Sequence, residues 1–221
     1  DGTTQTITIT IDGVNDAATF GGTLTGSLNE DADTVSGTAT VADVDAGEGS
    51  FTADTVSGTY GDLTIDASGN WVYDLDESNG DVQGLGGSDT LGDTLTVTSD
   101  DGTTQTITIT IDGANDDATF GGGLSVSVDE DATYSIGDTA TVSDVDNGQG
   151  TFTADTLDGT YGELTIAANG EWSYDLDESN GDVQGLLSGD TLGDTLTVTS
   201  DDGTAQTITI TITGANDDAT F

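Results

Sequence analysis

The chain repeats itself with a period of about one hundred residues. The segment DGTTQTITITIDG at residues 1–13 recurs unchanged at residues 101–113 and nearly unchanged at residues 202–214. A second segment, LDESNGDVQGL, occurs at residues 75–85 and again at residues 176–186, and one extra residue lies between Asp131 and Ala140 in the second copy. Self-similarity at a fixed period indicates that each copy is one structural unit, so the sequence predicts two whole units flanked by partial ones.

An Asn-Asp pair follows the Ile/Thr-rich segment in each copy, and we place the unit boundaries there. The pairs are Asn15-Asp16, Asn115-Asp116 and Asn216-Asp217. This predicts repeat 1 at residues 15–115, repeat 2 at residues 116–215 and the start of a following repeat at residues 216–221. Residues 1–14 are either the last strand of a preceding repeat or a strand completed by other means in this chain, and the sequence leaves both readings open.

The residue pattern within a unit is typical of β-structure. Residues 3–11 read TTQTITITI, a strict alternation that puts Ile7, Ile9 and Ile11 on one face of a half-buried strand. Strand signals recur about every 8 to 12 residues, which is typical of a sandwich of short strands. They begin at Leu24, Thr38, Ser50, Asp62, Asn70, Thr94 and Thr103. Helical periodicity is limited to one turn at residues 81–85. The predicted fold class is therefore all-β, with tandem immunoglobulin-like sandwiches of antiparallel strands.

The inward-facing side chains of repeat 1 can be listed from the alternation. They are Val41, Phe51, Leu63, Ile65, Trp71, Tyr73, Leu75, Leu95, Val97, Ile107, Ile109 and Ile111. Aromatic residues are only 5% of the chain and cysteine is absent, so this modest core needs a stabiliser other than a disulfide. High charge with 33 glycines is also compatible with disorder under metal-free conditions.

The charge balance excludes most partners and most chemistry. The chain has 43 acidic residues and no Lys, Arg or His, which gives a formal charge of -43. Nucleic acids and anionic membranes are bound through Lys and Arg, so we predict no nucleic-acid partner and no direct membrane contact. Without His, Cys or Lys, the common nucleophiles and His-ligated zinc are excluded. Paired carboxylates could hydrolyse glycosides, but nothing selects one of the many pairs, so we predict that the chain is not an enzyme.

The acidic residues form clusters at fixed places in each unit. Asp43 and Asp45, like Asp144 and Asp146, lie two apart on an extended segment and project to the same side. Calcium takes six to eight hard oxygen ligands, which this chain has in surplus. Adjacent carboxylates without a cation repel one another, so the grouping predicts bound calcium. The other clusters are Glu30-Asp31, Glu130-Asp131, Asp76-Glu77, Asp177-Glu178, Asp100-Asp101, Asp201-Asp202, and Asp112 with Asn115, Asp116 and Asp117.

Other acidic residues have a simpler interpretation. Scattered positions are expected to solvate loops and turns, as Asp does widely. They include Asp54, Asp62, Asp66, Asp89 and Asp93. No EF-hand run occurs, and the GGSDTLGD stretch at Gly86 is only a partial likeness to calcium β-roll repeats.

Taken in order, the motifs LNEDAD, TVADVDAGEGSF, LTIDASGNWVYDLDES, LTVTSDDG and DGANDDATF resemble the calcium motifs of cadherin repeats. They resemble still more closely the VCBS repeats of large bacterial RTX-type adhesins, and the likeness covers both units almost end to end. It implies extracellular β-sandwich extender modules with calcium at each junction.

The resemblance implies ligands at the first complete junction from both units. They would be Glu30, Asp76 and Glu77, then Asp112, Asn115, Asp116 and the Asp117 carbonyl, then Asp144, Asp146 and Asp201 or Asp202. Further candidates occupy the equivalent positions before and after this junction. Before it they are Asn15, Asp16, Asp43, Asp45, Asp100 and Asp101, and after it they are Glu130, Asp177, Glu178, Asn216 and Asp217. Three departures are the missing linker Pro, Ser78 in place of an acid, and Thr213 in place of Asp112.

The predicted function is a calcium-rigidified spacer of a bacterial cell-surface adhesin that projects a terminal domain away from the cell. Its expected partners are calcium ions and neighbouring repeats, and we expect a monomer. A calcium-dependent carbohydrate-binding module is the alternative, which would need exposed aromatic residues. Trp71, Tyr73, Trp172 and Tyr174 occupy matching places in the two units, and this repetition favours a core position for them. No signal peptide or transmembrane run occurs in this sequence.

Overall fold

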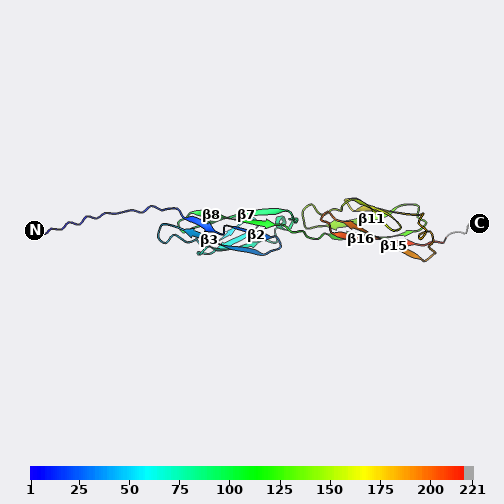
Figure 1. Ribbon diagram of the computed structural model, residues 1–221, viewed down its shortest axis with the longest axis horizontal. Helices are drawn as coiled ribbons and strands as arrows, with labels where there is room; N and C mark the ends of the chain where they lie inside the picture. The colour runs from blue at the N-terminus through cyan, green and yellow to red at the C-terminus, as the bar shows by residue number, and fades with distance from the viewer. Residues whose placement is uncertain (217–221) are drawn as a thin grey trace, which may run out of the picture. The chain divides into compact units, whose positions relative to one another are not determined.

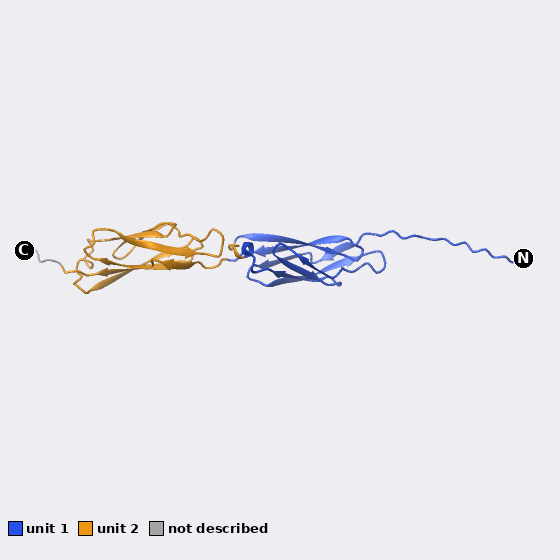
Figure 2. Ribbon diagram, turned by 180° about the vertical axis from the view of Figure 1, so that it is seen from behind, with its two compact units in different colours: residues 1–82, 88–114 blue, residues 83–87, 115–221 orange. Residues whose placement is uncertain are grey.

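The computed structural model describes residues 1–216, which form two compact units. Unit 1 comprises residues 1–82 and 88–114, and unit 2 comprises residues 83–87 and the chain from residue 115 onward (Figure 2). No helix within residues 1–216 is long and apolar enough to cross a membrane. The predicted repeat boundaries stay a prediction.

Unit 1 is a sandwich of two β-sheets (Figure 1). One sheet has five strands in the order β1-β3-β6-β5-β4 and the other has three in the order β2-β8-β7. The strands are β1 (Thr19–Gly22), β2 (Thr25–Asn29), β3 (Thr34–Ala42), β4 (Asp54–Ser57), β5 (Gly61–Ile65), β6 (Asn70–Leu75), β7 (Thr90–Thr98) and β8 (Thr104–Asp112). A single helical turn, α1 (Gly80–Gln83), follows β6, where the sequence predicted one at residues 81–85.

Unit 2 repeats this topology. Its five-stranded sheet has the order β12-β13-β14-β11-β9 and its three-stranded sheet the order β10-β16-β15. The strands are β9 (Thr119–Gly122), β10 (Ser125–Asp129), β11 (Ile136–Ser143), β12 (Asp155–Asp158), β13 (Gly162–Ile166), β14 (Glu171–Leu176), β15 (Thr191–Thr199) and β16 (Ala205–Thr213). The all-β sandwich prediction is therefore confirmed.

The strand pairing differs from the prediction at the start of each unit. The sequence predicted antiparallel strands, but β2 pairs with β8 in parallel, as β10 does with β16. The preceding strand, β1, which the sequence pattern did not reveal, pairs with β3 in the other sheet. The chain crosses between the sheets just after Gly22, whose positive φ of 76° is open to glycine and strained for other residues.

The core lies between the two sheets and follows the predicted alternation. All predicted inward side chains of unit 1 are buried except Val41, which is half-buried. Trp71 and Tyr73 from β6 in one sheet and Ile107 and Ile109 from β8 in the other are all buried, and unit 2 has the equivalent residues in its core. Burial on this alternating pattern is what stabilises two stacked sheets.

One predicted strand begins later in the structure and another does not form. Residues 50–53 contain only an isolated bridge between Phe51 and Ser99, and the strand there begins at Asp54. Residues 1–18 contain no strand, so Ile7, Ile9 and Ile11 are 79–90% exposed. The same sequence is buried in β8 because β8 lies between β2 and β7 in the three-stranded sheet.

Candidate metal centre

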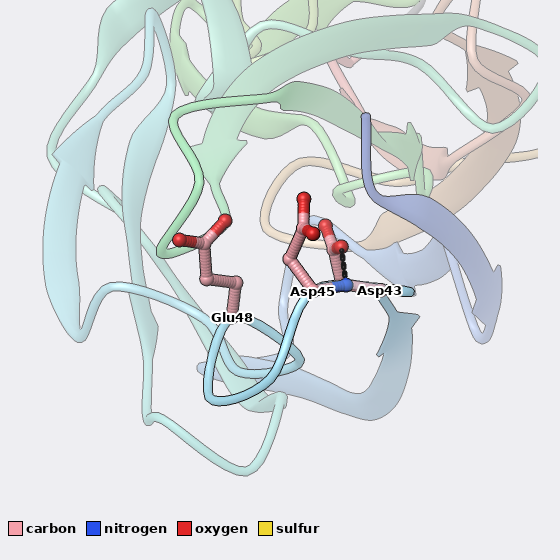
Figure 3. Close-up of side chains that lie close together, drawn as sticks. All are labelled: Asp43, Asp45 and Glu48. Atoms are coloured by element: carbon pink, nitrogen blue, oxygen red, sulfur yellow. Dashed lines mark hydrogen bonds between the residues drawn. The ribbon is translucent and has the colours of Figure 1, made fainter. Parts of the chain in front are cut away.

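The loop that follows β3 brings three carboxylates together. Asp43 and Asp45 flank Val44 just after the strand, and the Asp45 N–H donates to Asp43 Oδ1 at 2.8 Å. The loop then turns at Gly47, which has a φ of 97°, and the Glu48 side chain projects to the same side of the loop as the two aspartates (Figure 3). One carboxylate oxygen from each of the three residues lies within 4.8 Å of the others. Glu48 was not among the predicted ligands, although the motif TVADVDAGEGSF contains it.

Other predicted ligands of unit 1 surround this loop. The Asp16 N–H donates to Asp45 Oδ2 at 2.8 Å, and Asn15 lines one hollow with Asp45 and Glu48. The Ala18 N–H donates to Asp101 Oδ2 at 3.1 Å, so Asp101 fixes the entry of the chain into the sandwich. Asp100 accepts a hydrogen bond from Ser50.

Unit 2 has the equivalent arrangement. The Asp146 N–H donates to Asp144 Oδ1 at 2.9 Å, and the Asp116 N–H donates to Asp146 Oδ2 at 3.1 Å. Asp202 accepts from the Ala118 N–H at 3.2 Å, and Asp201 accepts a hydrogen bond from Thr151. Asp117 lies near Asp202, since Thr204 contacts both carboxylates. The structure therefore brings the predicted residues of this loop together within unit 2.

Several of these carboxylate oxygens are buried without a donor. Asp43 Oδ2, Glu48 Oε2, Asp144 Oδ2 and Asp146 Oδ1 have almost no accessible surface and no hydrogen-bond partner among residues 1–216. Asp146 is the most buried of the four residues, with 2% of its surface exposed. A buried carboxylate oxygen without a partner costs several kcal/mol, by an order-of-magnitude estimate, unless a cation neutralises it. The chain has no Lys, Arg or His side chain that could do so.

The electrostatics of the loops match this picture. Burial, followed by the charges of Asp45 and Asp43, raises the pKa of Glu48. Burial, partly offset by the Asp116 N–H, also raises the pKa of Asp146. Calcium prefers carboxylate oxygens that lie this close together and have no other positive partner. The residues present therefore fit this ion.

Neighbouring Ser and Thr hydroxyls lower the pKa of one aspartate in each unit. Hydrogen bonds from the side chains of Ser99 and Thr103 hold the pKa of Asp101 below its usual value. Burial alone would raise the pKa of Asp202, but it is lowered because hydrogen bonds from Ser200 and Thr204 outweigh that effect. These two carboxylates therefore stay ionised and fixed beside the acidic loops.

A second acidic group lies where β2 and β8 end. The Glu30 N–H donates to the Asp112 carbonyl at 3.0 Å, and Glu30 Oε1 accepts from the Ala114 N–H at 2.8 Å. In unit 2, Glu130 Oε1 accepts from the Ala215 N–H at 2.6 Å, and Glu130 lines one hollow with Asp131 and Glu178. Glu130 Oε2 is a further buried oxygen with no hydrogen-bond partner among residues 1–216.

The carboxylates of Asp76 and Glu77 have different hydrogen-bond partners. Asp76 Oδ1 accepts from both the N–H and the hydroxyl of Ser78, at 3.0 and 2.6 Å, and Asp177 makes the same turn with Ser179. These bonds lower the pKa of Asp177. Ser78, the residue in place of an acid, thus occupies one oxygen of Asp76.

Glu77 lies close to other acids of unit 1. A hydrogen bond with the side chain of Asp33, together with the charge of Asp33 and burial, raises the pKa of Glu77.

Among the predicted ligands at the end of the chain, Asn216 is the last residue described, and Asp217 lies outside the described residues. The ligand sets as a whole stay predictions.

One residue expected to solvate a loop has a different role. Asp93 is 3% exposed, and its carboxylate accepts hydrogen bonds from the N–H groups of Thr59 and Tyr60 and from the Tyr73 hydroxyl at 2.9 to 3.1 Å. Asp194 occupies the same place in unit 2. The expectation for Asp93 was therefore wrong because β7 places it on the same face as Leu95 and Val97, and that spacing is the signal that could have found it.

The paired aromatic residues are in the core, as their repetition predicted. Trp71, Trp172, Tyr73 and Tyr174 are all buried. The Trp71 indole N–H donates to the Thr23 carbonyl at 2.9 Å, and Trp172 makes the equivalent bond with Gly123 at 2.8 Å. None of these four side chains is available as a sugar-stacking surface.

The fold and these acidic loops define tandem cadherin-like β-sandwich domains. The model of the bacterial cadherin-like domain family matches residues 15–113 and again residues 115–214. The chain therefore belongs to the bacterial cadherin-like domain family. No curated protein matches it by sequence.

Solved cadherin structures share the fold at low sequence identity. A chain of protocadherin gammaB7 EC3-6, reported as a cis-dimer structure, is 16% identical with a TM-score of 0.54, and the match covers 90% of this chain and 48% of that one. Mouse cadherin-23 EC22-24 is 17% identical with a TM-score of 0.52, and the match covers 91% of this chain and 67% of that one. This chain thus spans about half the length of the protocadherin chain that it matches. Domains of this kind are adhesion and structural modules and are generally not enzymes.

Proposed function

We propose that this chain is a calcium-rigidified spacer of a bacterial surface adhesin. The observation that carries the proposal is the set of buried carboxylate oxygens without a donor, in a chain without a cationic side chain. Calcium is a hard cation of the size and ligand preference that these oxygens suit. When bound, it would supply the positive charge that the loops lack.

The residues that would hold calcium lie at the entry of each unit. In unit 1 they are Asn15, Asp16, Asp43, Asp45 and Asp101, and in unit 2 they are Asn115, Asp116, Asp144, Asp146 and Asp202. The acids near Ala114 and Ala215, Glu30 and Glu130 among them, would complete a junction with the next unit. Asp76 would contribute only the oxygen that Ser78 leaves, so we propose a smaller part for it.

A spacer function follows from repetition of nearly identical units. Such units contribute length by number, and calcium at each junction would stiffen the string. We further propose that residues 1–14 form the last strand of a preceding repeat, because their sequence is that of β8. The closer likeness to VCBS repeats of RTX-type adhesins, the monomeric state and the bacterial surface location belong to the same proposal.

The carbohydrate-binding alternative has less support. Its aromatic candidates are buried, and Tyr134 is the large exposed aromatic side chain of unit 2 with no counterpart in unit 1. A glycan array with the chain in calcium should show no binding above a control. Reproducible, calcium-dependent capture of one glycan class would favour the alternative.

The decisive test of the spacer is the double variant Asp144→Ala with Asp146→Ala. Gly113 and the absence of proline leave the bare linker free to bend, so bridging calcium would be needed to stiffen it. Small-angle scattering in saturating calcium should show an extended particle for the parent and a broader, more compact distribution for the variant. Asp54→Ala with Asp62→Ala is a matched control of equal charge change on exposed strand positions. A variant as extended as the parent would contradict the proposal.

A further inference from the structure

The loops after β3 and β11 differ in one ionisable residue. Both keep the Asp-Val-Asp sequence, but unit 1 continues with Gly47-Glu48-Gly49 and unit 2 with Gly148-Gln149-Gly150. Gly47 and Gly148 both have positive φ, at 97° and 85°, so the loops turn in the same way. The substitution therefore places a carboxylate in unit 1 where unit 2 has a neutral amide.

The two side chains make different contacts. Glu48 brings a third carboxylate within 4.8 Å of Asp43 and Asp45, and its Oε2 is buried with no hydrogen-bond partner among residues 1–216. In unit 2, Gln149 Nε2 donates to Asp146 Oδ2 at 3.1 Å. An amide donor therefore competes with a cation for Oδ2 of Asp146, while Oδ1 keeps no donor among residues 1–216.

A separate observation in the loop of unit 2 points to a cation. Asp146 is 2% exposed, yet its Oδ1 has no hydrogen-bond partner within the described residues. Oxygens that ligate one calcium ion at about 2.3 to 2.6 Å lie no more than about 5 Å apart. The spacing of the three unit 1 carboxylates, within 4.8 Å, meets this limit.

We propose that the residue at positions 48 and 149 sets the calcium affinity of each loop, with Glu48 as an additional ligand in unit 1 and Gln149 as an internal competitor in unit 2. The inference rests on the proposed function, since it assumes that calcium binds these loops. Affinity for calcium rises with the number of charged ligands. Each loop should therefore bind calcium more tightly with Glu at this position than with Gln.

The test is a reciprocal exchange, Glu48→Gln in unit 1 and Gln149→Glu in unit 2. Calcium binding is followed by nuclear magnetic resonance of the intact chain, with the amide signals of Gly47 and Gly148 as separate reporters of the two loops. We expect Glu48→Gln to raise the calcium midpoint of Gly47 about tenfold, which is the effect of one lost charged ligand. Gln149→Glu should lower the midpoint of Gly148 by a similar factor, and each loop should be unaffected by the change in the other.

Thermal unfolding in a chelator gives a second readout. Glu48→Gln removes repulsion between like charges, so it should raise the melting temperature of the calcium-free chain, and Gln149→Glu should lower it. Glu163→Gln, on the exposed face of β13, controls for the change in net charge and should leave both midpoints unchanged. These shifts require no assumption about which ligands the neighbouring unit supplies.

The outcomes separate the inference from the proposed function. If both reporters respond to calcium but neither exchange moves its midpoint by more than twofold, the role of residues 48 and 149 is wrong and the calcium sites stand. If neither reporter responds up to about 10 mM calcium, well above the range of extracellular sites, the proposed function itself fails.

Discussion

At the scale of single residues, the chain buries carboxylates in two different ways. Asp93 is buried with a full set of donors, which are the backbone N–H groups of Thr59, Tyr60 and Thr94 and the Tyr73 hydroxyl. Asp146 is equally buried, but its Oδ1 has no donor among residues 1–216. The first arrangement is stable by itself, whereas the second leaves one oxygen that a bound cation would satisfy.

Replacement of Asp93 by Ala should therefore destabilise unit 1 regardless of calcium. The change leaves the buried Tyr73 hydroxyl and the part-buried N–H groups of Thr59 and Tyr60 without their acceptor, which costs about 3 kcal/mol. Chemical denaturation in calcium and in chelator should show the same loss. Asp62→Ala, at an exposed position of β5, should change the free energy of unfolding by about 0.5 kcal/mol or less. A loss seen only in calcium would instead assign Asp93 to a metal site.

The acidic loops were partly visible in the sequence. The spacing of Asp43 and Asp45 predicted that they lie together, because residues two apart on an extended segment share a side. Glu48 was missed because its return toward the aspartates depends on the turn at Gly47, which spacing does not reveal. Asp93 was misjudged because residue type was weighed above its place in the alternation with Leu95 and Val97.

At the scale of elements, the crossover after Gly22 places β1 in one sheet and β2 in the other. A Cβ at Gly22 would lie 2.6 Å from the Thr38 carbonyl oxygen, so only glycine fits the turn between β1 and β2. The sequence pattern predicted the buried strands, because their apolar residues alternate. It did not predict the parallel pairing of β2 with β8, because that direction depends on the turn at Gly22, where the chain passes from one sheet to the other.

Gly22→Ala should accordingly cost more than alanine at another glycine of positive φ. The strain of the left-handed conformation is about 1 kcal/mol, and the clash with Thr38 adds to it, for a total of about 2 to 3 kcal/mol. Gly102 has a φ of 87° with nothing within 4 Å of its Cβ position, so Gly102→Ala should show the strain alone. The two variants are compared by urea denaturation. Equal losses would mean that the close approach at Gly22 relaxes without cost.

The N-terminal segment shows that a strand sequence needs its partners. Ile107, Ile109 and Ile111 are fully buried in β8, while the identical sequence at residues 1–13 is exposed. Deletion of residues 1–12 should therefore change the free energy of unfolding of unit 1 by less than about 0.5 kcal/mol, measured by denaturant titration. A loss above about 1 kcal/mol would show that the segment packs on the sandwich.

At the scale of the whole molecule, the central claim is that site-bound calcium supplies the charge that the chain lacks. Forty-three acidic residues without a cationic side chain repel one another, and general screening by salt reduces this without filling buried sites. Calcium at one hundred times its dissociation constant would add about 2.7 kcal/mol per site to the folded state. Specific binding and general screening therefore make different predictions at constant ionic strength.

The most direct measurement is thermal unfolding in millimolar calcium and in chelator at matched ionic strength. The account predicts a melting temperature several degrees higher in calcium, because one kcal/mol shifts the melting temperature of a domain of this size by about 4 to 8 °C. It also predicts that Asp144→Ala with Asp146→Ala reduces the calcium-dependent gain, while Asp54→Ala with Asp62→Ala retains it. Coincident melting curves in calcium and chelator would contradict the account.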